Sequence, residues 1–65
     1  MEIHMSNVTI GSRVYIPVGK QVMRNGAKAR QRRPGFITVR GTEPARDGKT
    51  RVFWMSRGYP ASALV

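Results

Sequence analysis

The chain has no cysteine and only one histidine, His4, among its 65 residues. The absence of cysteine excludes a disulfide scaffold and a cysteine-based zinc site. It is also compatible with a reducing cytoplasm, where we expect the protein to reside. A domain of this length hides only about 60% of the surface that its unfolded chain exposes. An aliphatic and aromatic core, alone or completed by a second copy, must therefore stabilise the fold.

Carboxylates are scarce as well, because only Glu2, Glu43 and Asp47 oppose twelve lysines and arginines, giving a formal net charge of +9 at pH 7. Nine of the twelve cations are arginines. Arginine has a planar fork that binds a phosphate with two hydrogen bonds and also stacks on bases. Such a charge creates a field that attracts phosphate polymers of any sequence. The composition therefore predicts a polyanionic partner, and nucleic acid in particular.

The sequence contains no convincing catalytic set. General acid and base catalysis needs positioned titratable groups, whereas His4 is near the N-terminus and Glu43 and Asp47 are in a turn-rich stretch. The glycines are spread as turn residues, and no glycine-rich phosphate loop is present. We therefore expect no enzyme activity, no cofactor and no metal.

Long apolar runs are also missing. None approaches the ~20 residues that span a membrane, and the N-terminus lacks the basic-then-apolar layout of a secretory signal. These absences predict a soluble protein without a membrane partner. Residues 1–7 follow no repeating pattern, so we expect a disordered lead or an expression-vector remnant, with translation starting at Met5. Residues 8–65 are expected to form one domain.

Alternating apolar and polar residues predict short strands. The most regular is Arg13–Ile16, and Phe36–Arg40 places its aliphatic residues on one face. A β-branched and aromatic run covers Thr50–Ser56, and we expect it to form an antiparallel hairpin with Phe36–Arg40 across the turn residues 41–49. The final residues, 61–65, are expected to form a 3₁₀ turn and a few closing paired residues.

Residues 19–33 lose this apolar periodicity, which predicts a long basic loop. The segment Lys20–Arg33 carries six cations and no acid. Two local structures stay open within it. One is a short hairpin with Asn25-Gly26 at its tip, and the other is a single helical turn over 27–31. Together the segments predict an all-β fold of four to five short antiparallel strands.

Four segments carry a family resemblance: Ile10–Ile16, Pro34–Val39, Val52–Trp54 and Ala61–Val65. In this order they resemble the SH3-like small β-barrels of the KOW and Tudor type. The resemblance implies that the strands close into a barrel. Residues 19–33 are longer and more basic than the short connection of a KOW motif, so the KOW binding residues are not carried over.

The stretch Tyr59–Leu64 resembles the end of the plasmid-encoded type II dihydrofolate reductases, which are small SH3-like barrels that work as tetramers. Their Val-Gln-Ile-Tyr stretch, which lines the shared pore, has no match in Arg51–Trp54, so their activity is not transferred. The size and basic character of the chain are also similar to those of phage and plasmid accessory proteins.

We expect the chain to contact DNA or RNA mainly through phosphates. The predicted contact residues are Lys20, Arg24, Lys28, Arg30, Arg32, Arg33, Arg40, Arg51 and Arg57. Exposed rings of small β-barrels also stack on bases, and the candidates for stacking are Tyr15, Phe36 and Trp54. Adjacent Phe53 and Trp54 point to opposite faces of a regular strand, so only one of them can lie in the core.

Two alternatives of other classes stay open. The first is an adaptor or inhibitor that docks on an acidic protein partner through the same cations. The second is a small oligomeric enzyme with a pore on its symmetry axis, as in the type II dihydrofolate reductases. The sequence does not decide between a monomer and a small homo-oligomer, nor between single-stranded and double-stranded nucleic acid.

Overall fold

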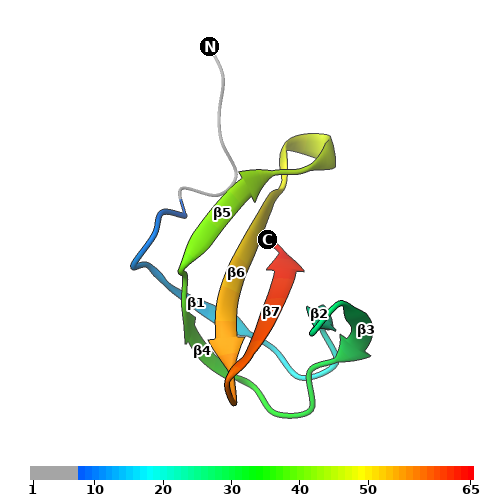
Figure 1. Ribbon diagram of the computed structural model, residues 1–65. Coiled ribbons are helices and arrows are strands. Elements are labelled where there is room, and N and C mark those ends of the chain that lie inside the picture. The colour runs from blue at the N-terminus through cyan, green and yellow to red at the C-terminus, as the bar shows by residue number, and fades with distance from the viewer. Residues whose placement is uncertain (1–7) are drawn as a thin grey trace.

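The computed structural model describes residues 8–65, which form short strands and one 3₁₀ turn (Figure 1). The expectations about residues 1–7, including the start at Met5, lie outside the described residues. The strands are β1 (Arg13–Ile16), β2 (Gln21–Arg24), β3 (Ala27–Arg30), β4 (Gly35–Thr38), β5 (Gly41–Pro44), β6 (Thr50–Ser56) and β7 (Tyr59–Leu64), and the 3₁₀ turn is η1 (Arg46–Gly48). None of the helical structure in 8–65 is long and apolar enough to cross a membrane.

The strands form two antiparallel sheets, so the predicted all-β class is confirmed, whereas the predicted number of four to five strands is wrong because residues 8–65 form seven. One sheet is β1–β4, and the other has five strands in the order β3-β2-β7-β6-β5. The chain leaves the first sheet at the end of β4 and enters the second as β5. At this passage the Arg40 N–H donates to the Phe53 carbonyl at 2.8 Å. The two ladders are separate and do not form one continuous ring, so the closed SH3-like barrel stays a prediction.

The core lies between the two sheets, and in Figure 1 β1 crosses behind β6 and β7. Its buried apolar residues are Ile16, Val22, Val39, Val52, Trp54, Ala61 and Ala63. On β1, β2 and β6 alternate residues face inward, as the two-residue period of a strand requires, whereas β7 buries three consecutive small residues. Trp54 on β6 is the register partner of Ala61 on β7, so the large indole has a small neighbour across the ladder. This pairing lets one tryptophan fill much of a thin core.

The predicted strand Arg13–Ile16 is confirmed with the same bounds. The faces predicted for the next strand are also confirmed, because Ile37 and Val39 turn toward the core while Phe36 is exposed. Their two-residue alternation is strong in the sequence, since each strand has one face on the core and one face in water.

The long loop predicted over 19–33 is wrong, because β2 and β3 form a hairpin there. A hairpin with Asn25-Gly26 at its tip was one of the two local structures left open by the sequence, and it is confirmed. The other, a helical turn over 27–31, is wrong. Both tip residues have positive φ, 50° for Asn25 and 83° for Gly26, as a two-residue type I′ turn requires. The hairpin is stabilised further by the pairing of β2 with β7 and by the burial of Val22.

The predicted hairpin of Phe36–Arg40 with Thr50–Ser56 is wrong. β4 pairs with β1, whereas β6 pairs with β5 and β7. Part of the predicted turn 41–49 is therefore strand β5. Residues 61–64 belong to β7 and pair with β6, so the predicted closing pairing is confirmed and the predicted 3₁₀ turn is wrong. The Pro60 carbonyl accepts a hydrogen bond from the Asn25 N–H at 2.8 Å, which ties β7 to the tip of the β2–β3 hairpin.

Candidate anion-binding site

Five arginines line a pocket of about 820 Å³ where the ends of β2 and β6 meet the start of β7. We call it the arginine pocket, and its arginines are Arg24, Arg30, Arg32, Arg33 and Arg57. The remaining lining comes from Asn25, Ala29, Gln31, Ser56, Tyr59 and Pro60, so no carboxylate is among the lining residues. The pocket has the size of a ligand site, but its lining is cationic where ligand sites are mostly apolar. It therefore suits an anion.

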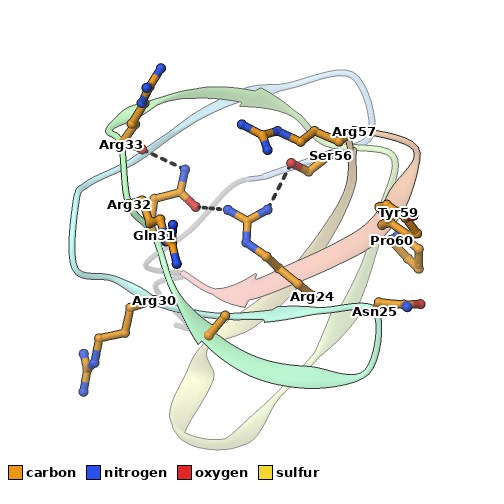
Figure 2. Close-up of a pocket in the computed structure, with 11 residues that line it drawn as sticks. Arg24, Asn25, Arg30, Gln31, Arg32, Arg33, Ser56, Arg57, Tyr59 and Pro60 are labelled. Carbon is orange, nitrogen blue, oxygen red and sulfur yellow. Dashed lines mark hydrogen bonds between the residues drawn. The ribbon is translucent and has the colours of Figure 1, made fainter.

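Arg24 occupies the inner end of the pocket. It follows the core residue Val22 by two positions on β2, so its side chain leaves the same face of the strand, and it is half-buried. One terminal nitrogen, Nη1, donates to Ser56 Oγ at 3.0 Å, and the other, Nη2, donates to Gln31 Oε1 at 2.7 Å (Figure 2). These two bonds hold the guanidinium across the gap between the two hairpins.

Gln31 in turn is held by the backbone, because its Nε2 donates to the Arg33 carbonyl at 2.8 Å. The amide therefore presents its oxygen to Arg24 and its nitrogen to the segment that carries Arg32 and Arg33. This chain of hydrogen bonds fixes the guanidinium of Arg24 without any carboxylate. Its positive charge thus stays available to a bound anion.

Arg57 enters the pocket from the two-residue turn between β6 and β7. Its φ of 53° lies in the left-handed region, and the following Gly58 has a φ of 81°. Outside glycine this region favours asparagine and aspartate, and for a long side chain it costs roughly 1–2 kcal/mol. The equivalent turn between β2 and β3 has the favoured residue, Asn25, in the same position. The strained arginine is therefore a feature that turn stability does not explain.

The other cations of the pocket come from β3 and the segment after it. Arg30 donates through Nη1 to the Gly19 carbonyl at 3.0 Å. The guanidinium groups of Arg32, Arg33 and Arg57 have no hydrogen-bond or ion-pair partner on the described chain. In Figure 2 Arg57 extends over the opening, whereas Arg30 and Arg33 point away from the rim. Three charged forks are thus free for an external anion.

The pocket unites five of the nine cations that the sequence predicted as contacts. Lys20, Lys28 and Arg51 line a second, smaller groove of about 330 Å³ together with Lys49, which the sequence did not single out. Arg51 is tied to Ser62 Oγ by a hydrogen bond of 3.1 Å from Nη1. We call this the lysine groove.

Two further observations separate the remaining cations from the arginine pocket. Arg51 has Glu43 as its register partner on β5, so an acid lies near one wall of the lysine groove. Arg40 is exposed between β4 and β5 and lines neither cavity. The structure therefore divides the predicted contact residues among separate surfaces.

The three candidate stacking residues lie in different environments, one buried and two exposed. Trp54 is only 5% exposed and belongs to the core, so its ring has no face for a base and the prediction is wrong for this residue. Tyr15 and Phe36 are 52% and 61% exposed. They are register partners on β1 and β4, and their ring centroids are 5.3 Å apart at an interplanar angle of 63°. The two rings thus form one exposed edge-to-face pair.

Three residues of these surfaces were missed by the sequence reasoning. Gln31 and Ser56 carry no signal, because their role depends on the approach of two hairpins that only the fold brings about. Arg13 has its Cζ 5.3 Å from the centroid of the Phe36 ring. The alternation of β1 already puts Arg13 on the face of Tyr15, but the pairing with β4 was not predicted.

Residues 8–65 contain no cluster of three histidine, aspartate or glutamate side chains that could hold a metal ion. The functional groups of the arginine pocket are thus guanidinium, amide and hydroxyl groups, which bind anions by charge and hydrogen bonds. No protein-family model matches the chain, and no curated protein and no solved structure matches it either.

Proposed function

We propose that the chain binds nucleic acid, with backbone phosphates held in the arginine pocket. The observation that carries this proposal is the gathering of five arginines, without any lining carboxylate, around one cavity. Like charges held this close repel one another, and a bound polyanion relieves the repulsion. Arginine forks also match the geometry of phosphate oxygens, with two parallel hydrogen bonds for each pair.

The arrangement favours a polymer over a single small anion. Arg33 and Arg57 have free forks and come from different segments of the lining. Arg57 extends over the opening and Arg33 points outward from it, so successive phosphates of one strand can each meet a cation. The strained turn at Arg57 adds support, because strained backbone persists at binding sites where a side chain must be held in place. The passage of the chain from β4 into β5 supports an SH3-like barrel as the scaffold.

A charge-matched pair of variants tests the proposal. The site variant is Arg33→Gln/Arg57→Gln, and the control is Arg40→Gln/Arg46→Gln, whose two arginines are exposed and lie outside the arginine pocket. Each variant lowers the net charge of +9 by two, so the long-range attraction changes equally. Fluorescence anisotropy with a labelled oligonucleotide at about 100 mM salt measures the affinities.

We expect the site variant to bind at least about 10-fold more weakly than the control, since each lost hydrogen bond to a charged group is worth about 1.5–3 kcal/mol. Equal losses in the two variants would mean that overall charge, and not the pocket, provides the affinity. A wild-type chain that binds no oligonucleotide at about 50 mM salt would refute the proposed function, because its charge should give at least non-specific affinity there.

A further inference from the structure

The outer face of the β1–β4 sheet carries an exposed aromatic pair. Tyr15 and Phe36 face away from the core, because their strand neighbours Ile16 and Ile37 face into it. Both side chains are more than half exposed to solvent. Contiguous exposed apolar groups on a small domain mark binding surfaces. We call Tyr15 and Phe36 the aromatic platform.

A cation borders the platform. The Arg13 guanidinium lies over the Phe36 ring, with 5.3 Å from Cζ to the ring centroid. This contact is a cation–π interaction, which orients the guanidinium while leaving its N–H groups unused. Arg13 has no hydrogen-bond or ion-pair partner on the described chain. Arg13 thus offers a phosphate-binding fork next to two exposed rings, and a nucleotide carries a phosphate next to a base.

The platform is also close to the arginine pocket along the chain. Arg33 of the pocket lining and Phe36 on the platform are three residues apart, so their Cα atoms are separated by at most about 11 Å. A single strand whose phosphates contact Arg33 therefore has a base within reach of Phe36.

We propose that the aromatic platform stacks on unpaired bases of a single-stranded nucleic acid whose phosphates bind in the arginine pocket. The inference rests on the proposed function and adds the class of ligand. Exposed aromatic rings hold single strands because every base has a π-face, whatever the sequence. In a duplex these faces are hidden within the base stack, so the platform distinguishes single strands from duplexes.

The test compares ligands that differ only in their bases. A single-stranded oligothymidylate of about 12 nucleotides, which is within the range of small β-barrel binding sites, is compared with an abasic strand of equal length and with a duplex. The platform variant is Tyr15→Thr/Phe36→Thr, because threonine keeps a high strand propensity and neither position is in the core. The control Met55→Thr removes exposed apolar surface from the other sheet.

We expect the wild-type chain and the control to bind oligothymidylate at least about 10-fold more tightly than the abasic strand, since each stacked base is worth about 1–3 kcal/mol. The platform variant should lose this difference, with unchanged affinity for the abasic strand and the duplex. Circular dichroism checks that all variants keep the fold.

Each other outcome has a definite meaning. If the platform variant keeps its preference for oligothymidylate over the abasic strand, the stacking inference is wrong while the proposed function stands. If no strand or duplex binds to the wild type, the proposed function fails first. Sedimentation of the wild type as a dimer and of the platform variant as a monomer would overturn the inference, because the rings would then form a contact between copies.

Discussion

Arg57 and Asn25 occupy equivalent positions in two neighbouring hairpin turns, with φ values of 53° and 50°. Asparagine tolerates this left-handed conformation because its short polar side chain bonds locally, whereas arginine has no such compensation. Both side chains line the arginine pocket. The two turns can therefore be compared directly: Asn25 suits the left-handed backbone, whereas Arg57 suits the binding of an anion.

Substitution of Arg57 should change binding and stability in opposite directions. The substitution Arg57→Asn should leave the melting temperature unchanged or raise it by several degrees, because relief of about 1 kcal/mol shifts Tm by roughly 4–8 °C in a domain of this size. The same substitution should weaken oligonucleotide binding. Differential scanning fluorimetry and anisotropy measure the two effects.

The reciprocal substitution Asn25→Arg is the control for this prediction. It should lower the melting temperature by a similar amount, because it puts a long side chain into the left-handed conformation of the other turn. Binding should not weaken, since the new cation lines the same pocket. A loss of both stability and binding in Arg57→Asn would show that the arginine serves the turn itself.

The elements of the fold follow from alternation wherever a strand contributes large apolar residues to the core. β6 buries Val52 and Trp54 and leaves Met55 exposed, as a two-residue period requires. Val52 is fully buried between the sheets, whereas Val18, in the turn that follows β1, is 61% exposed. The same side chain thus stands in two opposite environments.

This contrast predicts the effect of one substitution made at both sites. Val52→Ala should lower the free energy of unfolding by about 1–3 kcal/mol, since it removes buried methyl groups and leaves a cavity in a thin core. Val18→Ala should change it by less than about 0.5 kcal/mol, as is usual at exposed positions. Urea denaturation followed by Trp54 fluorescence measures both changes. Equal losses at the two sites would contradict the assignment of the core.

Two elements were not predictable from the sequence, for physical reasons. β3 consists of Ala, Lys, Ala and Arg and has no large apolar residue, so its pairing with β2 gives no periodic signal. β5 consists of Gly, Thr, Glu and Pro, which are typical of turns. It forms an edge strand at one side of the five-stranded sheet, where proline is tolerated. In both cases the pairing is determined by the adjacent strand, β2 for β3 and β6 for β5.

The same limit applies to the candidate site. The sequence identified the cations of the pocket by their density between residues 20 and 33, and it also listed Arg57. It did not show that Arg57 lies beside Arg24, because that neighbourhood arises from the pairing of β2 with β7. For the same reason it did not separate the arginine pocket from the lysine groove.

At the scale of the whole molecule, most of the positive charge gathers on two separate surfaces. Five cations line the arginine pocket and four line the lysine groove. The cations outside both are Arg13, Arg40 and Arg46. A net charge of +9 on a domain of this size destabilises the compact state through repulsion and steers the molecule toward polyanions.

The salt dependence of duplex binding tests most directly whether the arginine pocket holds backbone phosphates. The logarithm of the association constant falls with the logarithm of the salt concentration with a slope of about −0.9 for each phosphate neutralised. Contacts by the five pocket arginines predict a slope of about −4 to −5. The variant Arg33→Gln/Arg57→Gln should make the slope shallower by about 2, and Arg40→Gln/Arg46→Gln should leave it unchanged. A slope near zero, or an equal change in both variants, would contradict the account.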